Sequence, residues 1–228
     1  MTLPRACFAG MLCMLATGAA AQGNVAQSAA QTVQVTQSRA ANAALLKQYA
    51  WNERIDFLVG GQEKDMRLDL VNVGPDGKLQ RTVLNDQSAP LPGGFLRRKI
   101  AEDKKKDVQR YIQGLSELLH QYTLPSPGAV MNFLDAASTV PVAPGQLMVT
   151  GRNVVQPGDS LTIYLDAATK KTQRVVVSTA FQGDPVGVSA TFATLASGLN
   201  YPAFAEVTVP AKGYLVRVQN FNYQQNGM

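Results

Sequence analysis

Apolar and polar residues alternate along two neighbouring stretches in the first third of the chain. Residues 51–59 and 64–73 place apolar side chains mostly at every second position, which is the period of a strand with one buried and one solvated face. In the second stretch we expect Leu68 on the buried face and Arg67 and Asp69 on the solvated face. Comparable patterns predict seven further strands, at residues 79–84, 146–155, 159–166, 172–181, 185–195, 201–209 and 214–223.

Between the third and the fourth predicted strands, apolar residues recur every three to four residues. Apolar residues recur at this spacing at Val108, Tyr111, Ile112, Leu115, Leu118, Leu119 and Tyr122. The pattern predicts a helix with one apolar stripe that lies on a core. Lys104 stands one turn before Val108 and ends the stripe, so we expect the carboxyl-terminal half to pack and the basic half to lie at the surface. Shorter helices are predicted from Thr36 and in residues 128–138.

These elements predict an α+β fold with about nine antiparallel strands and two or three helices. A twisted sheet of this width curls and leaves a concave apolar face that helices can fill. We therefore expect a strongly curved half-barrel wrapped over helices, built as one domain from residues 36–228. Residues 22–35 are rich in Gln, Ala and Ser without a firm period, which is typical of a flexible leader.

The first residues predict the compartment. Residues 1–21 contain one basic residue, Arg5, then an apolar run that ends in Ala19, Ala20 and Ala21, as in a cleaved secretory signal peptide. We therefore expect the protein in the periplasm or secreted. Both cysteines, Cys7 and Cys13, lie inside this segment. The mature chain is then expected to have no thiol, no disulfide and no lipid anchor.

Two resemblances add to this prediction. The succession of IYLDAATKKTQRVVV, VSATFATLASGLNYPAFAEVTV and YLVRVQNFNY resembles the strand, hairpin and closing strand of the periplasmic lipoprotein carriers and their sensor relatives, over residues 44–224. More closely, YAWNER, GPDGKLQRT and PGDSLTIYLDAATKK are similar to segments of a family of uncharacterised secreted bacterial proteins. The first resemblance implies the half-barrel fold, and both imply export. Neither implies a catalytic residue.

One short motif in the chain is also found in a class of enzymes. PGDSL, residues 157–161, contains the letters of the GDSL ester hydrolases, in which the serine is the nucleophile and a histidine follows near the end of the domain. Here His120 is the only histidine and precedes Ser160, so the serine lacks a base and a turn before a strand is the favoured interpretation. With one histidine and no mature cysteine we expect no metal site, no cofactor and no enzymatic activity.

The basic half of the long helix leaves two alternatives open. Segment 97–120 holds seven Lys or Arg and four Asp or Glu, so much of the positive charge of the chain is local. Export argues against nucleic acid as a partner. Contact with anionic lipid headgroups is one alternative, because Phe95 and Leu96 stand directly before Arg97, Arg98 and Lys99. A solvated helix face with pairs such as Glu102 with Lys106 is the other.

Two functions from different classes follow. The first is a non-enzymatic envelope protein that binds a lipid, a lipoprotein acyl chain or another apolar ligand on the concave face. Its candidate ligand-binding residues are Phe57, Leu68, Leu115, Phe181 and Phe192. The second is a structural or partner-binding envelope protein whose own side chains fill the core. The first requires unfilled apolar volume and the second does not.

Overall fold

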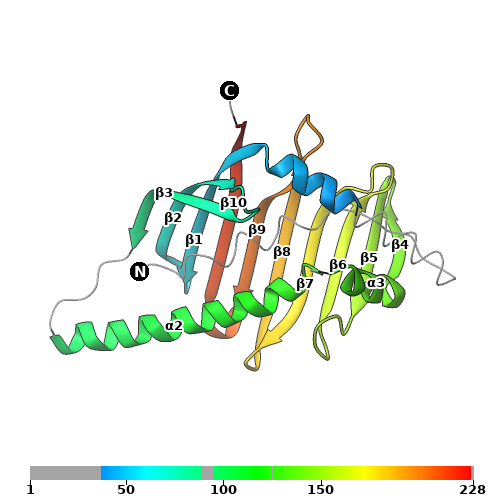
Figure 1. Cartoon of the computed structure of the whole chain (residues 1–228). Helices are drawn as coiled ribbons and strands as arrows, with labels where there is room; N and C mark the ends of the chain where they lie inside the picture. Colours follow the sequence, from blue (N-terminus) through cyan, green and yellow to red (C-terminus); the bar gives the residue numbers. More distant parts are fainter. Residues whose placement is uncertain (1–36, 89–94, 125, 227–228) are drawn as a thin grey trace.

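The computed structural model is an α+β fold in which one antiparallel sheet of ten strands carries its helices on one face (Figure 1). The sheet is open and curved, so the predicted class, a curved antiparallel sheet wrapped over helices, is confirmed. The structure describes residues 37–88, 95–124 and 126–226, without the side chains of residues 88, 95–102, 104 and 105. The predicted signal peptide and leader lie outside the described residues.

Nine of the ten strands coincide with predicted strands, and β4 was not predicted. β4 is short, mostly exposed and interrupted by Pro141, so it lacks the alternation that marks the other strands. The strands are β1 (Tyr49–Val59), β2 (Gln62–Val73), β3 (Leu79–Ser88), β4 (Ser138–Ala143), β5 (Gln146–Arg152), β6 (Ser160–Asp166), β7 (Thr172–Phe181), β8 (Asp184–Thr194), β9 (Asn200–Val209) and β10 (Tyr214–Gln225). Their order in the sheet is β3-β2-β1-β10-β9-β8-β7-β6-β5-β4.

This order explains the long helix. β3 and β4 lie at opposite edges of the sheet, so the chain between them has to cross its full width. Ten strands spaced about 4.8 Å apart span about 43 Å. The crossing consists of α2 (Phe95–Gln121) and α3 (Pro127–Ala136), and 27 residues of α-helix alone extend about 40 Å. In Figure 1 the first turns of α2 extend beyond the β3 edge of the sheet.

The carboxyl-terminal half of α2 packs on the sheet, as the apolar stripe predicts. Its buried apolar side chains are Tyr111, Ile112, Leu115 and Leu119, and the buried Tyr122 follows directly after the helix. They join one core with the inward side chains of strands β5 to β10 and with Phe57 of β1. Gly114 permits this close approach, because a Cβ atom there would lie 2.8 Å from Cζ of Phe181. Ser126 caps the amino terminus of α3 by accepting a hydrogen bond from the Ala129 N–H.

A second, smaller core lies under the first helix, residues 37–46. It consists of Leu46, Tyr49, Trp51, Val71 and Leu199. Hydrogen bonds tie this helix to the start of β9 and to the turn that follows α2. Asn42 exchanges two with the backbone of Asn200, at 2.8 and 2.9 Å, and Arg39 donates to the carbonyl oxygens of Thr123 and Leu124. The helix thus connects the sheet to the turn that follows α2.

The buried face of β2 is the reverse of the expected one. Asp65 and Asp69 are buried, whereas Leu70 is exposed. Asp69 pairs with Glu53 in the register of β1, and Glu53 shares its face with Phe57. Charged side chains can occupy this covered face because two ion pairs neutralise them, Arg67 with Asp69 at 2.8 Å and Arg81 with Glu53 at 3.2 Å. The expectation of Arg67 and Asp69 on the solvated face is therefore wrong.

Candidate functional site

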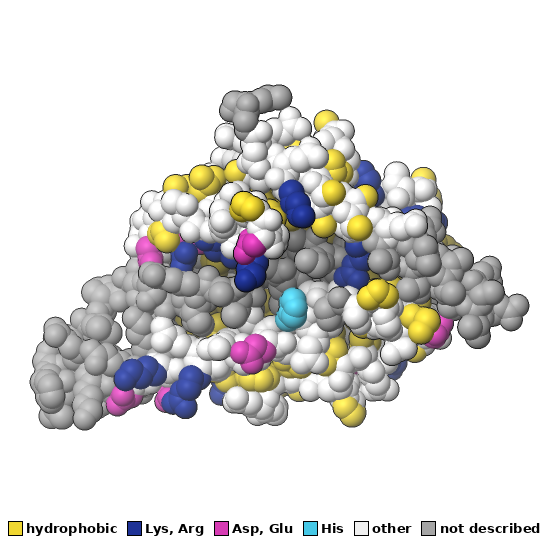
Figure 2. All heavy atoms as spheres, viewed as in Figure 1, with side chains coloured by type: hydrophobic (Ala, Val, Ile, Leu, Met, Phe, Trp, Pro, Cys, Tyr) yellow, Lys and Arg dark blue, Asp and Glu magenta, His cyan; other side chains and the backbone are white. Residues whose placement is uncertain are grey.

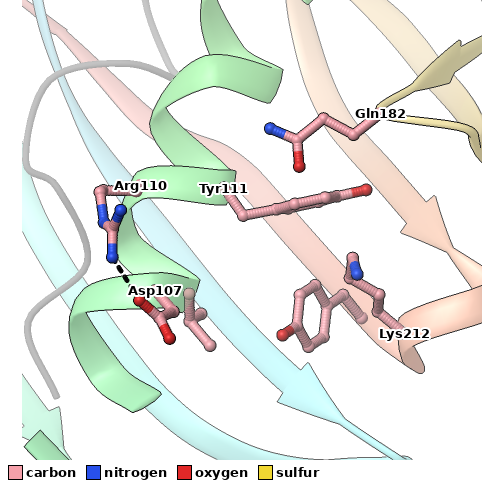
Figure 3. A pocket seen from close by; sticks show the side chains of 7 residues that line it. Asp107, Arg110, Tyr111, Gln182 and Lys212 are labelled. Atoms are coloured by element: carbon pink, nitrogen blue, oxygen red, sulfur yellow. Dashed lines mark hydrogen bonds and ion pairs between the residues drawn. The ribbon is translucent and has the colours of Figure 1, made fainter. Parts of the chain in front are cut away.

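A pocket of about 630 Å³ opens at one end of the packed half of α2 (Figure 3). We call it the rim pocket, because it lies where α2 meets the turns at one end of the strands. Its described lining residues are Asp107, Val108, Arg110, Tyr111, Gln182, Lys212 and Tyr214. They come from α2, from the turn between β7 and β8, and from the corner between β9 and β10.

Aromatic rings connect the rim pocket to the core. Tyr111 meets Phe181 edge to face with ring centroids 5.1 Å apart, and it meets Tyr214 in the same way at 5.9 Å. Tyr214 in turn contacts Phe57 at 5.5 Å. Edge-to-face contacts at these distances stabilise aromatic pairs beyond the area that they bury. The wall of the pocket is therefore continuous with the apolar face under α2.

The charges at the rim pocket are balanced. Asp184 accepts a hydrogen bond from the Tyr111 hydroxyl at 3.0 Å and forms an ion pair with Lys212 at 3.3 Å. The ammonium group of Lys212 also lies 4.9 Å from the centre of the Tyr111 ring, in cation–π range. On the helix, Arg110 pairs with Asp107 (Figure 3). Each cation at this pocket thus has a carboxylate partner.

The hydroxyl of Tyr111 in the rim pocket is not activated as a base or nucleophile. Burial raises the pKa of Tyr111 well above its ordinary value, and the neighbouring Asp184 carboxylate raises it further. The phenol therefore stays protonated at neutral pH and acts as a hydrogen-bond donor. A catalytic base or nucleophile requires the opposite shift, so the Tyr111 phenol is not activated for either role.

The other end of the packed half of α2 is closed by a buried hydrogen-bond network. Tyr122 donates to Oδ2 of Asp159 at 2.5 Å, and its oxygen lies 2.7 Å from the hydroxyl of Thr179. Gln156 donates from Nε2 to Thr179 at 2.7 Å. Asp159 also accepts backbone N–H groups of Val154, Val155 and Gln156 at 2.6 to 2.9 Å. This network fixes the loop between β5 and β6 against the end of the helix.

The pKa of Asp159 reflects the number of donors that surround its carboxylate. Burial alone would raise the pKa of the carboxyl group, but the Tyr122 hydroxyl and three backbone N–H groups together hold it below its ordinary value. The pKa of Tyr122 moves upwards, first because of burial and second because of Asp159. An ionised aspartate and a protonated tyrosine therefore form a stable pair at neutral pH.

A second pocket, of about 510 Å³, lies beside this network between α3 and the β5–β6 loop. We call it the α3 pocket. Its described lining residues are Gln121, Leu124, Ala129, Asn132, Phe133, Ala136, Gly151, Arg152, Asn153, Val154 and Val155. It shares no lining residue with the rim pocket, and the two pockets flank the packed half of α2. The sequence pattern did not indicate either pocket.

The candidate ligand-binding residues from the sequence divide between the two faces of the sheet. Phe57 on β1 and Leu115 on α2 are fully buried in the main core, and Phe181 and Phe192 are partly buried against the same core. Leu68 pairs with Arg54 on the opposite face of the sheet, because the covered face of β2 carries its charged residues. Four of the five residues thus lie together, and Leu68 does not join them.

The charged covered face of β1 to β3 is a feature that the alternating pattern concealed. Asp69 is 1% exposed, and its Oδ2 atom and the Nη1 atom of Arg67 are buried without a hydrogen-bond partner. Burial raises the pKa of Glu53, while Arg81 acts in the opposite direction. The spacing of Asp65, Arg67 and Asp69 at every second position was the available signal, since it places opposite charges on one face.

The GDSL letters have a structural role. Ser160 is the first residue of β6 and pairs with Arg152 and Ser178 in the sheet, so the predicted turn before a strand is confirmed. Asp159 holds the loop through the contacts described above. His120 lies on α2 with an exposed side chain, outside the apolar stripe. The histidine is drawn in cyan in Figure 2.

The remaining expectations concern metals and membranes. Within residues 37–88, 95–124 and 126–226, no three His, Cys, Asp or Glu side chains come together as a metal site. None of the described helices is long and apolar enough to cross a membrane. α2 begins at Phe95, but the side chains of Phe95, Leu96, Arg97, Arg98 and Lys99 lie outside the described residues. On the face in Figure 2, the described cationic side chains are interspersed with acidic and apolar ones.

Comparison with known proteins gives likenesses of fold alone. No family model and no curated protein matches the chain. A DUF1329 family protein from Desulfovibrio piger has a TM-score of 0.41 at 11% identity, over 91% of this chain and 95% of that one. A putative outer membrane lipoprotein-sorting protein domain from Vibrio parahaemolyticus has a TM-score of 0.43 at 9% identity, over 87% and 94%.

A LolA superfamily protein from Nitrosomonas europaea has a TM-score of 0.30 at 10% identity, over 82% of this chain and 92% of that one. All three TM-scores lie below 0.5, so nothing about ligands, activity or family is drawn from these likenesses.

Proposed function

We propose that the chain is a non-enzymatic protein of the cell envelope that binds the apolar chain of a lipid between its sheet and α2, entering at the rim pocket. The observation that carries the proposal is the aromatic wall of this pocket. Tyr111 and Tyr214 stand at the opening, and their rings lead to Phe181 and Phe57 at the edge of the main core. An apolar chain placed there would gain contact with rings that are already ordered.

The size and the chemistry of the pocket support binding without catalysis. A volume of about 630 Å³ falls within the range of about 300–1,000 Å³ that is usual for small-molecule sites. Its cationic groups each have a carboxylate partner, so a ligand would not have to neutralise an isolated charge.

A second candidate function is favoured by a different observation. The apolar stripe of α2 already occupies the concave face, and Leu115 and Leu119 are 0% exposed. A structural or partner-binding protein with a self-filled core would look the same at this position. The two functions differ at the rim pocket, which the first requires and the second does not.

Two measurements test the proposal. Mass spectrometry of lipids that co-purify with the protein from its native envelope is expected to find a bound acyl lipid. Binding of the neutral fluorescent probe phenylnaphthylamine is expected for the parent protein and is expected to fall at least tenfold in Val108→Trp, which fills the rim pocket. Gln113→Trp, on an exposed position of the same helix, is the matched control and is expected to bind like the parent.

Absence of lipid in the extract together with absence of probe binding by the parent would contradict the proposal and leave the self-filled core. Equal binding by Val108→Trp and the parent would show that the probe binds elsewhere. In that case the rim pocket would not be the entrance.

A further inference from the structure

We propose that the α3 pocket is a separate site for a single acyl chain that ends in an anionic group, a carboxylate or a phosphate. The site goes beyond the function proposed above, because lipid binding at the rim pocket does not use it. The rim pocket contacts α2 from Asp107 to Tyr111, whereas the α3 pocket begins at Gln121. Nine residues of helix separate Tyr111 from Gln121, so the two sites can be tested independently.

The interior of the α3 pocket is suited to an apolar chain. Four larger apolar side chains form its surface, and two alanines on α3 leave the space open. The four are Leu124, Phe133, Val154 and Val155, and the alanines are Ala129 and Ala136. Leu124 and Phe133 are buried, so the bottom of the pocket belongs to the core rather than to the solvated surface. Contact with such a surface removes a chain from water at about 25 cal/mol per Å².

The walls of the pocket are held in place by the surrounding structure. Asp159 fixes the wall formed by Val154 and Val155, since its carboxylate accepts both of their N–H groups. The opposite wall is fixed by Phe133, which lies against β5 where Gly151 has no side chain. A Cβ atom at Gly151 would lie 2.6 Å from Cε2 of Phe133. A preformed site loses little conformational entropy when a ligand binds.

The opening of the pocket carries an unopposed positive charge. Arg152 is exposed and lines the pocket, and its side chain has no ion-pair or hydrogen-bond partner within the part of the chain that the structure describes. The described lining residues include no Asp or Glu. The rim pocket differs in this respect, because Arg110 and Lys212 each have a carboxylate partner there.

These features together define the class of ligand. A guanidinium group binds carboxylate and phosphate oxygens through parallel hydrogen bonds, and this geometry is specific for planar or tetrahedral anions. Asn132 and Asn153 also line the pocket, and their amides offer further donors. Inorganic phosphate would leave the apolar interior unused, and a neutral lipid would leave Arg152 unpaired. A free fatty acid and the monoacyl chain of a phospholipid share the required chemistry.

The experiment is a calorimetric titration of the protein with dodecanoate, carried out in the Val108→Trp background so that the rim pocket is filled. Binding at one site is expected. Arg152→Gln is expected to weaken it about tenfold or more, since a hydrogen bond to a charged group is lost. Ala136→Leu, at an exposed position that ends α3, is expected to abolish it by filling the pocket. Dodecanol, the neutral match, is expected to bind more weakly and to be indifferent to Arg152→Gln.

Arg174→Gln is the control for loss of one positive charge, because Arg174 is exposed on β7. A parallel titration with lysophosphatidylglycerol below its micellar concentration distinguishes the sources: binding of dodecanoate alone identifies a free fatty acid, and binding of both identifies a phospholipid headgroup as acceptable. The proposal is overturned if dodecanoate does not bind to the Val108→Trp protein. It is also overturned if adding Arg152→Gln or Ala136→Leu to this protein leaves dodecanoate bound as tightly as before. Loss of dodecanoate binding in Val108→Trp alone would place the acyl chain in the rim pocket and leave the proposed function intact.

Discussion

Tyr111 lies on the packed half of α2 and Tyr122 follows directly after its last residue, and each fastens the helix to the sheet through an aspartate. At one end Tyr122, Asp159 and Thr179 are buried together, and backbone N–H groups complete the coordination of the carboxylate. At the other end the bond from Tyr111 to Asp184 is partly buried and borders the rim pocket. A hydrogen bond from tyrosine to aspartate is thus buried at one end of the helix and borders a pocket at the other.

This difference indicates where the helix can yield. Separation of Tyr122 from the sheet would leave a buried carboxylate without one of its donors, which is expensive in a dry environment. Separation of Tyr111 would leave Asp184 still paired with Lys212 and accessible to water. The end at Tyr122 therefore acts as the fixed point, and the end at Tyr111 is the one that can adapt to a ligand.

The largest effect is expected from Leu115→Ala, because Leu115 lies between the two ends and is fully buried. The cavity should lower the free energy of unfolding by about 2–5 kcal/mol. Urea unfolding followed by circular dichroism measures this loss, with the exposed Gln113→Ala as control, expected within about 0.5 kcal/mol of the parent. A loss below about 1 kcal/mol for Leu115→Ala would mean that α2 is not part of the cooperative core.

The comparison itself is tested by replacing each tyrosine with phenylalanine. Tyr122→Phe removes the donor to a buried carboxylate and should cost about 1–3 kcal/mol, whereas Tyr111→Phe removes a partly buried hydrogen bond and should cost about 0.5–1.5 kcal/mol. Both are measured by the same urea titration. Equal losses, or a larger loss for Tyr111→Phe, would contradict the assignment of the fixed end.

The pH dependence of stability sharpens the description of the fixed end. Because the pKa of Asp159 is held below its ordinary value in the folded protein, its contribution is complete above about pH 4 and is lost as the pH falls further. The difference in free energy of unfolding between the parent and Asp159→Asn should therefore be constant from about pH 7 to about pH 5 and should shrink towards about pH 3. A difference that does not change over this range would contradict the depressed pKa.

The smallest effect is expected from the part of α2 that precedes both tyrosines. Replacement of Lys104, Lys105 and Lys106 together with glutamine should change stability by about 0–1 kcal/mol if the sequence prediction of a solvated basic half is correct. Co-sedimentation with phosphatidylglycerol vesicles at low salt then separates the two alternatives for the basic half. Loss of vesicle binding in the triple variant would support a membrane contact, and failure of the parent to bind would support a solvated face.

Local periodicity was sufficient to predict most of the architecture. The strand and helix periods are properties of neighbouring residues, so nine strands and the packed half of α2 could be predicted without knowledge of their partners. β4 was missed because Pro141 and exposure on both sides remove the alternation. The reversal of β2 was missed because hydrophobicity does not reveal which face is covered when ion pairs neutralise the buried one.

The sites were harder to predict, since their residues are distant in the chain. Tyr122 reaches Asp159 across 37 residues and Thr179 across 57. The rim pocket combines one helix with two turns from the last third of the chain, and Lys212 approaches Tyr111 only because β9 and β10 meet there. Phe57, Phe181 and Phe192 were predictable as inward aromatic positions. Whether space remains beside them depends on three-dimensional packing.

The pairing of β10 with both β1 and β9 has a consequence for the order of folding. Without β10 the sheet consists of two separate pieces, β1 to β3 and β4 to β9, which meet only through this strand. Tyr49 at the start of β1 pairs with Gln225, so contacts of very long sequence separation close the sheet. Such contacts slow folding, because the entropy of a large loop is lost before they form. Synthesis begins at the amino terminus, so β1 is made long before β10 and one edge of β1 stays unpaired until β10 is complete. A chaperone that shields this edge would raise the yield of native protein.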